Sequence, residues 1–216
     1  MWLLRHCVLC QRLQQRWCCQ QCWGAIAPFQ ASGDPSWSVC ITPQHPCISY
    51  APYTGNIQQL LYLMKYHGFR SLAKELGTEL GRWYRQHWPL PDVVIPVPLH
   101  ASRQQERGYN QSEVLARALA RQIKRPLWCA LQRERATPRL YNLSPAARAE
   151  HLAEAFVLAS PTPEVTLYAG ASLLIVDDIL TSGSTLKSAM DALLAVSHRQ
   201  VGLTLARADI TDPLDL

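Results

Sequence analysis

The sequence contains no apolar run that approaches the roughly 20 residues needed to cross a bilayer. Arg5 and His6 follow the first four residues, so the N-terminus also lacks the apolar stretch of a signal peptide. Charged residues are scarce at 17% and apolar residues reach 48%, which excludes a disordered chain and is typical of a globular protein. We therefore expect a soluble, cytoplasmic protein without membrane insertion.

Internal repeats and low-complexity tracts are also absent, and 216 residues suffice for one α/β domain with a small appendage. Apolar residues at helical spacing predict helices over 57–68, 71–87, 112–124 and 184–196. Apolar and β-branched runs predict strands over 92–98, 127–131, 172–176 and 201–206. The alternation of strands and helices indicates an α/β fold with a mostly parallel, twisted sheet flanked by helices.

Two stretches show neither pattern. Residues 42–55 are expected to form a proline-containing linker, and residues 100–111 a polar, arginine-rich loop. The first 50 residues are rich in Cys, Gln, Trp and Pro, without a sustained apolar period. We therefore divide the chain into a Cys-rich module over 1–50 and a sheet-bearing domain over 51–216.

The most informative segment is LLIVDDILTSGST, over 173–185, where a predicted strand is followed by two acids and a hydroxyl-rich loop. Ligands of open parallel sheets bind beyond the carboxyl ends of the strands, where Asp177 and Asp178 are expected. The loop consists of Thr181, Ser182, Gly183, Ser184 and Thr185. Its glycine permits a tight turn whose N–H groups converge on one anion, and the dipole of the following helix favours that anion. Two carboxylates beside such a phosphate site suit the vicinal diol of a ribose 5-phosphate.

Two other interpretations of this segment are open. Two acids after a strand also occur as the magnesium-binding acids of P-loop ATPases, but the chain lacks a GxxxxGK[ST] segment. The loop could also be an ordinary helix cap, although a cap needs one hydroxyl and not four around a glycine. The phosphate site is the favoured interpretation.

The net charge of +5 is unevenly distributed along the chain. Residues 56–160 carry 15 Lys and Arg against 8 Asp and Glu, whereas residues 161–216 carry 3 against 7. A basic middle could follow a nucleic-acid backbone or line a pocket for a ligand rich in phosphate. Solvated helix faces are the simpler alternative for many of these arginines.

Cysteines are equally uneven, since seven of the eight precede residue 48. In a cytosolic chain such clustering indicates metal binding more than disulfides. Two CxxC pairs predict a structural Zn²⁺ site with four thiolate ligands: Cys7, Cys10, Cys19 and Cys22. Cys18 is an alternative to Cys19, and a redox CxxC is an alternative to zinc. A second metal site could involve the remaining candidates Cys40, His45 and Cys47.

Residues 173–185 resemble the binding motif for phosphoribosyl pyrophosphate (PRPP) of type I phosphoribosyltransferases: four apolar residues, two acids, then T-[ST]-G-x-[ST]. The segments PVPLHASRQQERGYNQ and RERATPRLYNLSPAARAEHLAEAF and the Cys-bearing N-terminus extend the likeness. Essentially the whole chain resembles the ComF/GntX family of competence and DNA-utilisation proteins. The resemblance implies a type I phosphoribosyltransferase fold with an N-terminal zinc ribbon, and the use of PRPP with Mg²⁺.

The resemblance also implies roles for individual residues. Asp177 and Asp178 would be the catalytic acids that hold the ribose diol and stabilise positive charge developing on the sugar. The further residues expected to bind pyrophosphate or PRPP are Pro98, Leu99, His100, Arg103, Arg107 and Arg135. Residues 133–150 would form a hood loop that closes over PRPP and excludes water. Lys65 is similar to a recurrent lysine of the family, although a surface lysine is the simpler interpretation.

Two departures from the family pattern concern the hood, since Leu140 stands where the family usually has Gln and His151 where it has Asn. They leave two functions open. One is a Mg²⁺- and PRPP-dependent phosphoribosyltransferase with an unidentified acceptor. The other is a domain that senses PRPP or a nucleotide while its zinc ribbon and basic middle engage single-stranded DNA or a DNA-uptake protein. The sequence identifies neither the acceptor nor the oligomeric state.

Overall fold

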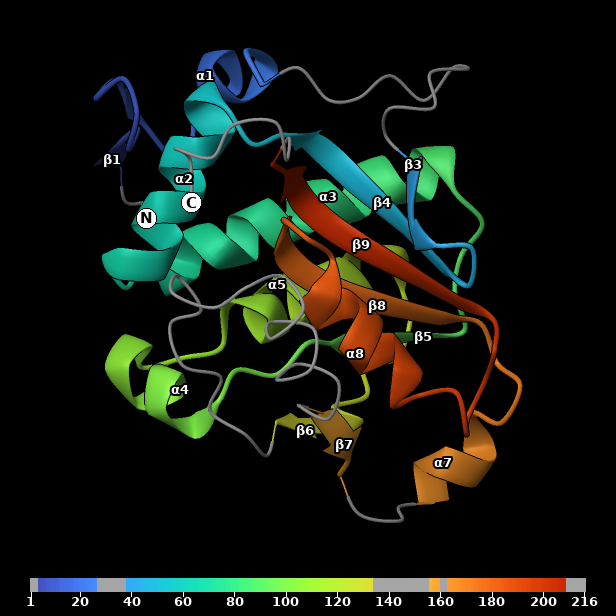
Figure 1. Cartoon of the computed structure of the whole chain (residues 1–216). Helices are drawn as coiled ribbons and strands as arrows, with labels where there is room; N and C mark the ends of the chain where they lie inside the picture. Colours follow the sequence, from blue (N-terminus) through green and yellow to red (C-terminus); the bar gives the residue numbers. More distant parts are fainter. Residues whose placement is uncertain (1–3, 27–37, 134–155, 160–162, 209–216) are drawn as a thin grey trace.

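A computed structural model describes residues 4–26, 38–133, 156–159 and 163–208 (Figure 1). Its centre is a five-stranded sheet in the order β3-β4-β9-β8-β5. The strands are β3 (Ser38–Thr42), β4 (His45–Pro52), β9 (Gln200–Arg207), β8 (Leu173–Leu180) and β5 (Val93–Pro96). β4, β9, β8 and β5 are parallel, and β3 forms an antiparallel hairpin with β4. The expected α/β fold with a mostly parallel sheet is confirmed.

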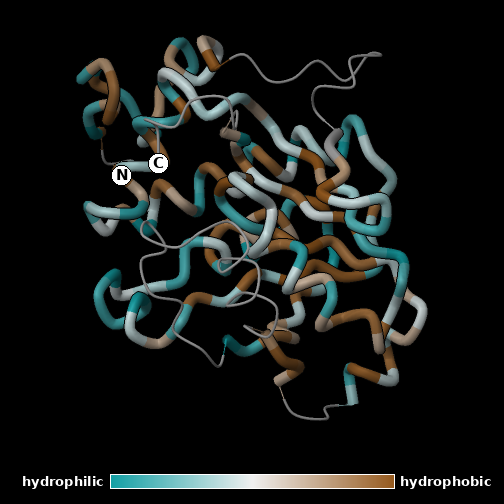
Figure 2. The backbone as a smooth tube through the Cα atoms, viewed as in Figure 1, coloured by the Kyte–Doolittle hydropathy of each residue, from teal (hydrophilic) through white to brown (hydrophobic). Residues whose placement is uncertain are grey.

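Helices cover both faces of this sheet because its central strands are apolar on both sides. On one face lie α2 (Gly55–Tyr66), α3 (Arg70–His87) and α5 (Gln111–Ile123), packed on side chains such as Leu174 and Val176. On the other face, α8 (Ser184–Asp191) packs on Leu173 and Ile175, together with the small sheet of β6 (Leu131–Arg133) and β7 (Phe156–Leu158). Figure 2 shows the apolar residues concentrated in the sheet and polar residues along the outer helices. A short helix, α7 (Pro163–Leu167), precedes β8.

The linker expected over 42–55 is wrong, because most of it is β4. Pro46 and Pro52 lie near the two ends of this strand, where proline is best tolerated, and residues 47–51 between them are buried. β4 pairs with β9 and therefore belongs to the central sheet. The boundary at residue 50 thus falls inside a strand of that sheet, and the division into two domains stays a prediction.

Other boundaries also differ from expectation. The loop expected over 100–111 contains the helix α4 (Ala101–Arg107), which ends at Gly108 in the left-handed region with φ 75°. β8 continues to Leu180, four residues beyond the predicted strand, because β9 pairs with it over its whole length. The strand expected over 127–131 is reduced to one bridge between Val94 and Leu127 before β6 begins.

Two glycines set the position of α5. Gly77 and Gly81 lie one turn apart on α3, where the helix crosses α5. A Cβ atom on Gly77 would lie 2.4 Å from the carbonyl oxygen of Leu115, and one on Gly81 would lie 2.9 Å from the Cβ of Gln122. The absence of side chains at these positions therefore lets the backbones of α3 and α5 approach closely.

The Cys-rich residues 4–26 form β1 (Arg5–His6), β2 (Leu13–Gln14) and α1 (Gln20–Gly24). They are attached to α3 through Glu75, whose carboxylate accepts the backbone N–H groups of Trp17 and Cys18 at 2.9 and 3.2 Å. Arg16 pairs with the same carboxylate at 3.3 Å. Among the residues that the structure describes, no helix combines the length and apolar character needed to cross a membrane.

Candidate functional site

The two acids of the PRPP-like segment lie within β8, at its carboxyl end, and not in the loop that follows it. Successive side chains of a strand point to opposite faces, so Asp178 shares the face of Leu174 and Val176, on which α2 and α5 pack. Its Oδ1 lies 3.0 Å from the Nζ of Lys65, the penultimate residue of α2. The lysine expected on the surface is therefore half-buried beside the acid pair.

Asp177 receives two hydrogen bonds on its Oδ1. The hydroxyl of Ser112 donates at 2.7 Å and the backbone N–H of Asp178 at 2.9 Å. Burial, followed by the charge of Asp178, raises the pKa of Asp177 from 3.8 to about 6, against the opposing effects of these two donors and Lys65. Strongly shifted carboxyl groups of this kind are typical of functional sites.

The hydroxyl-rich loop leads from β8 into α8, as expected. Gly183 adopts φ 76° and precedes the first turn of α8, and no side chain caps that turn. Thr181 and Ser182 are exposed, while the hydroxyls of Ser182 and Ser184 lie 2.7 Å apart. Because these hydroxyls do not cap the helix, they remain available to a ligand, which favours the phosphate site over the ordinary cap.

The segment after β5 leaves the sheet next to the acid pair. The N–H of Val97 donates to the carbonyl of Val176 at 3.0 Å, so residues 98–102 begin beside Asp177. Pro98, Leu99 and His100 are half-buried, and the Nδ1 of His100 caps α4 by accepting the N–H of Ser102 at 3.2 Å. The structure thus brings this loop and the 177–185 segment to the same edge of the sheet.

A buried asparagine fixes the return of the chain from α4 to α5. The side chain of Asn110 donates to the carbonyl of Val97 at 3.0 Å and accepts the N–H of Ser112 at 3.0 Å. Ser112 is thereby held against Asp177. Asn110 belongs to the GYNQ run that the family resemblance places beside the pyrophosphate loop, whereas Ser112 was not predicted to belong to the site.

The predicted arginines are only partly accounted for. Arg107 stacks over Tyr66, with 5.5 Å from its Cζ to the ring centroid, and donates to Gln111 at 3.3 Å. Arg103 is half-buried on α4. Arg135, Leu140 and His151 lie outside the described residues.

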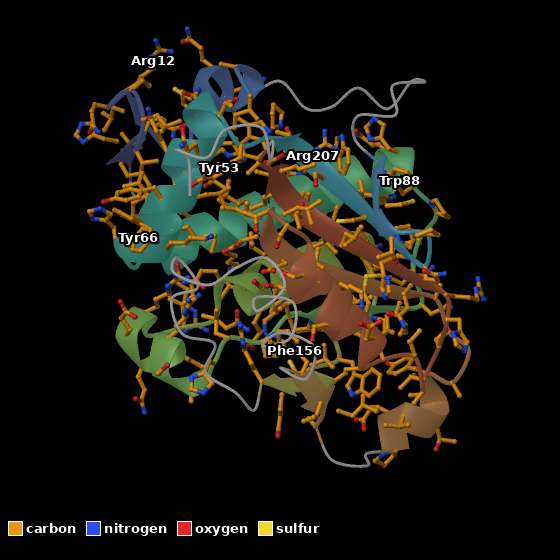
Figure 3. All side chains as sticks on the ribbon, viewed as in Figure 1. Arg12, Tyr53, Tyr66, Trp88, Phe156 and Arg207 are labelled. Atoms are coloured by element: carbon orange, nitrogen blue, oxygen red, sulfur yellow. The ribbon has the colours of Figure 1, made fainter. Side chains whose placement is uncertain are left out.

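Some of the basic middle consists of solvated helix faces. Arg117 pairs with Glu113 at 2.8 Å within α5, and Arg82 pairs with Glu79 at 2.6 Å within α3. The exposed side of α2 carries aromatic rings instead of ion pairs, near the C-terminal end of the helix. Tyr62 and Tyr66 are 53% and 63% exposed, with ring centroids 5.1 Å apart, and Tyr66 lies on the side of the molecule that carries α4 (Figure 3).

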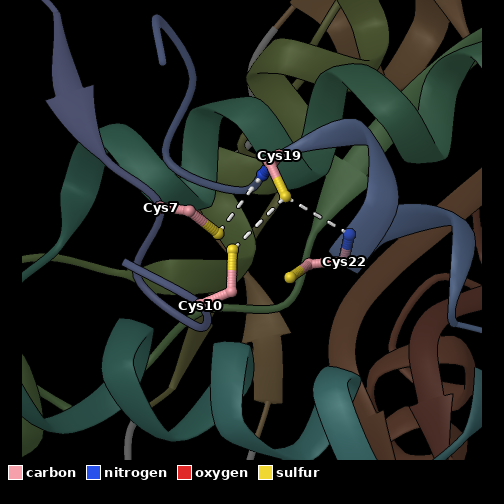
Figure 4. A group of neighbouring side chains, drawn as sticks. All are labelled: Cys7, Cys10, Cys19 and Cys22. Atoms are coloured by element: carbon pink, nitrogen blue, oxygen red, sulfur yellow. Dashed lines mark hydrogen bonds between the residues drawn. The ribbon is translucent and has the colours of Figure 1, made fainter. Parts of the chain in front are cut away.

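Four cysteines of the N-terminal residues converge, as the two CxxC pairs predict (Figure 4). The sulfurs of Cys7, Cys10, Cys19 and Cys22 all lie within 4.8 Å of one another, and those of Cys10 and Cys19 are 3.7 Å apart. Tetrahedral thiolates around Zn²⁺, with bonds of about 2.3 Å, have their sulfurs about 3.8 Å apart. The cluster therefore has the donor set and dimensions to hold a metal ion such as zinc.

Backbone amides support the same cluster. The N–H of Cys19 donates to the sulfur of Cys7 and that of Cys22 to the sulfur of Cys19, each at 3.4 Å. Burial raises the pKa of Cys7, but hydrogen bonds from the backbone N–H groups of Cys10, Cys19 and Leu9 and from the Cys10 thiol outweigh it and lower this pKa to about 6, so the thiolate form is favoured. Cys18 points away, since its thiol donates to the carbonyl of Cys19 at 3.7 Å. Cys19, and not Cys18, is thus the fourth member.

The residues considered for a second metal site are not brought together in the part of the chain that is described. The thiol of Cys47 donates to the carbonyl of Ile48 at 3.8 Å, and Cys40 is exposed. His45 is engaged on both ring nitrogens, by Thr42 at 2.5 Å and Asp191 at 2.8 Å.

Comparison with known proteins adds a family to this geometry. Residues 109–211 match the family described as Phosphoribosyl transferase domain. Competence protein F of Haemophilus influenzae is 32% identical over 178 residues, which cover 81% of this chain and 75% of that protein. DNA utilization protein YhgH of Salmonella typhi is 31% identical over 166 residues, which cover 70% of this chain and 67% of that protein. Among solved structures, adenine phosphoribosyltransferase of Leishmania tarentolae aligns with a TM-score of 0.42 at 11% identity, over 80% of this chain and 94% of that one.

Proposed function

The chain belongs to the ComF family of competence and DNA utilization proteins, and we propose that its phosphoribosyltransferase-type domain binds PRPP at the carboxyl edge of the central sheet. The observation that carries this proposal is the convergence of an acid pair with an uncapped, hydroxyl-rich helix start at that edge. Asp177 and Asp178 bind the ribose diol, and residues 181–185 bind the 5-phosphate. The loop 98–102 binds the pyrophosphate.

Each element suits the part of the ligand assigned to it. The first N–H groups of α8 are free because no side chain caps them, and a helix N-terminus favours an anion. Carboxylates accept hydrogen bonds from sugar hydroxyls, and Ser112 already holds one of them in position at 2.7 Å. Arg103 and Arg107, on the helix after the pyrophosphate loop, supply positive charge toward a leaving group of high negative charge.

Mg²⁺ fits this scheme, because it prefers oxygen ligands and usually binds through substrate phosphates. When bound with PRPP, Mg²⁺ would neutralise part of the charge of the pyrophosphate leaving group, while Asp177 and Asp178 would hold the ribose diol. The chain itself fixes the sugar between the acid pair and the 181–185 loop. This positions the anomeric carbon for displacement of pyrophosphate by a nitrogen nucleophile, and the ionised acid pair stabilises the positive charge that develops on the ribose.

The proposed reaction is the transfer of the 5-phosphoribosyl group to an acceptor that the sequence does not name. Titration of PRPP into the protein by calorimetry, with and without Mg²⁺, tests binding. Pyrophosphate release in a screen of nucleobases and amines then tests transfer. Asp177→Asn and Asp178→Asn are expected to abolish release, whereas Arg117→Ala, on the solvated face of α5, serves as the control. Binding of PRPP without release for any acceptor would limit the function to sensing.

A second function is favoured by the exposed aromatic pair on α2. Stacked bases of single-stranded DNA bind to exposed aromatic rings flanked by cations. Tyr62 and Tyr66 provide two such rings, and the guanidinium of Arg107 lies over the second one. We propose that this surface binds single-stranded DNA, so that the domain would act in DNA uptake or utilisation as a binding module, alone or besides catalysis.

This second proposal has its own test. Affinity for a single-stranded oligonucleotide is expected to fall with rising salt, since cations on the protein replace counterions of the backbone. Tyr62→Ala and Tyr66→Ala should each weaken binding by roughly 1–3 kcal/mol, while Asp177→Asn should not. Absence of binding at low salt would exclude the DNA-binding function and leave the PRPP site untouched.

We further propose that Zn²⁺ occupies the cluster of Cys7, Cys10, Cys19 and Cys22 as a structural ion. Residues 4–26 have few buried side chains of their own, so metal binding would contribute much of their folding energy. A cytoplasmic location, in which cysteines stay reduced and can bind a metal, is part of this proposal. Metal analysis of the purified protein tests the ion, with one zinc per chain expected.

A further inference from the structure

Lys65 takes no part in the function proposed so far, yet it makes the only ion pair that the described residues show with the acid pair. Its Nζ lies 3.0 Å from the Oδ1 of Asp178, and the side chains are 18% and 13% exposed. Ion pairs between long, exposed side chains contribute little, because they are solvated and mobile. This pair is mostly removed from water, so solvent screens the attraction between its two charges only weakly.

The backbone of α2 fixes the position of this lysine. Ile57, Leu60, Leu61 and Met64 anchor the helix to the core with 1% exposure or less. At its C-terminal end, the hydroxyl of Tyr109 donates to the carbonyl of Met64 at 2.5 Å. At its N-terminal end, the side chain of Asn56 donates to the carbonyl of Cys22 at 2.8 Å. Hydrogen bonds at both ends of α2 therefore fix the position of Lys65 beside Asp178.

The position of Lys65 beside Asp178 matters because the proposed ligand is an anion. PRPP carries a phosphate and a pyrophosphate, whereas two adjacent carboxylates would oppose any anion that approaches them. An ammonium group 3.0 Å from one carboxylate offsets one of the two charges and leaves the other oxygen of Asp178 for the sugar. A neutral side chain in place of Lys65 would leave both charges uncompensated in a site poor in water.

We infer that Lys65 is a positioning residue of the ribose 5-phosphate site, which orients Asp178 and lowers the negative charge that the acid pair presents to an anionic sugar phosphate. This inference rests on the proposed PRPP site. It assigns Lys65 an action through Asp178, and not a direct contact with the phosphates of the ligand. If Lys65 acts through Asp178, its loss should not affect PRPP affinity once Asp178 is replaced by Asn. If Lys65 contacts the phosphates directly, its loss should weaken binding in both backgrounds.

The test is a double-mutant cycle on PRPP affinity, measured by calorimetry in the presence of Mg²⁺. Lys65→Met keeps the length and helix propensity of the side chain but removes its charge, and should weaken PRPP binding about tenfold or more. Lys65→Arg should restore most of that loss. Lys74→Met, at an exposed position of α3, is the matched control and should leave affinity unchanged. In the Asp178→Asn background, Lys65→Met should have little further effect.

A second readout does not require PRPP. Carboxyl NMR titration of the wild type and Lys65→Met follows the acid pair directly. The charged or titratable groups near the pair besides Lys65 are Arg133, Cys47 and Tyr109. Only Lys65 changes in the variant, and its charge lowers the pKa of Asp177, so this pKa should rise in Lys65→Met and return in Lys65→Arg.

The outcomes are distinct. Unchanged affinity and unchanged titration in Lys65→Met would overturn the inference. An equal loss of affinity in the wild-type and Asp178→Asn backgrounds would also overturn it, because Lys65 would then act on the ligand itself. If the folded wild type fails to bind PRPP while the titration still shifts, the proposed function fails and the positioning of Asp178 by Lys65 stands.

Discussion

Asp177 offers a direct test of the idea that the site is held in an unfavourable state for function. Both hydrogen bonds to its carboxylate, from Ser112 and from the N–H of Asp178, end on Oδ1. Asparagine has a carbonyl oxygen at the same place and can accept both. Asp177→Asn therefore changes mainly the charge, and leaves the packing and the two donors as they are.

The expected magnitude follows from the pKa of Asp177, which burial and the charge of Asp178 raise from 3.8 to about 6. This difference corresponds to about 3 kcal/mol, at 1.36 kcal/mol for each pH unit. Since the pKa in the folded state is the higher one, protonation of Asp177 stabilises the fold below pH 4, and this contribution is lost as pH rises through 6. At pH 8 Asp177→Asn should raise the free energy of unfolding by up to about 3 kcal/mol, while it abolishes PRPP binding.

The assay is urea denaturation of the wild type and Asp177→Asn at pH 8 and pH 4.5. The gain in stability should shrink at the lower pH, where the wild-type carboxyl is protonated in the folded state. Asp92→Asn gives a control of opposite sign, because hydrogen bonds from the N–H and hydroxyl of Ser172 lower the pKa of Asp92, and its loss should destabilise the protein at pH 8. An Asp177→Asn protein that is no more stable than the wild type at pH 8 would refute the reasoning.

Four further substitutions probe the fold, the hydroxyl-rich loop and the metal cluster. Gly77→Ala should lower the free energy of unfolding by about 1–3 kcal/mol, because the new Cβ would lie 2.4 Å from the carbonyl oxygen of Leu115. Gly24→Ala is the control: a Cβ there would meet nothing within 4 Å, so this change should be neutral or stabilising by up to about 1 kcal/mol. Urea denaturation of both variants measures the difference. Gly183→Ala should lower the free energy of unfolding by about 1–2 kcal/mol, because alanine is unfavourable at φ 76°. The variant should also bind PRPP more weakly in calorimetry. Full PRPP affinity would argue against a phosphate-binding loop at this position. Cys10→Ser should release the bound zinc, measured with a colorimetric chelator, and a protein that retains one zinc per chain would exclude this cysteine as a ligand.

The part of the site that the sequence predicts best is continuous in the chain. In 173–185 a buried strand, two acids and a glycine-centred hydroxyl loop follow one another, so local chemistry alone indicates the ligand. The structure keeps this order and changes only the extent of β8, which includes both acids. Ser112 and Lys65 were missed as site residues because they reach the acids from other helices. Ser112, on α5, is 65 positions from Asp177, and Lys65, on α2, is 113 positions from Asp178. Contacts over such separations cannot be recognised in a single sequence.

β4 was missed for a different physical reason. Its sequence, HPCISYAP, has prolines near both ends and a short apolar run between them, which is typical of a linker as much as of a strand. The strand forms because β9 provides a parallel partner on one side and β3 an antiparallel one on the other. Tertiary pairing of this kind outweighs local preference, since β propensity depends strongly on neighbouring strands.

The two motifs that the sequence presents as separate modules share one core. Cys18 and Ile26 are buried together with α2 and α3, and the carboxylate of Glu75 on α3 holds the backbone at Cys18. The helix that touches the cysteine cluster through Asn56 carries Lys65 to Asp178 at its other end. Ordering of the cluster by a metal ion would therefore favour the position of α2 in which the acid pair is compensated. In this arrangement the Cys-rich segment supports, through α2, the edge of the sheet at which PRPP binding is proposed.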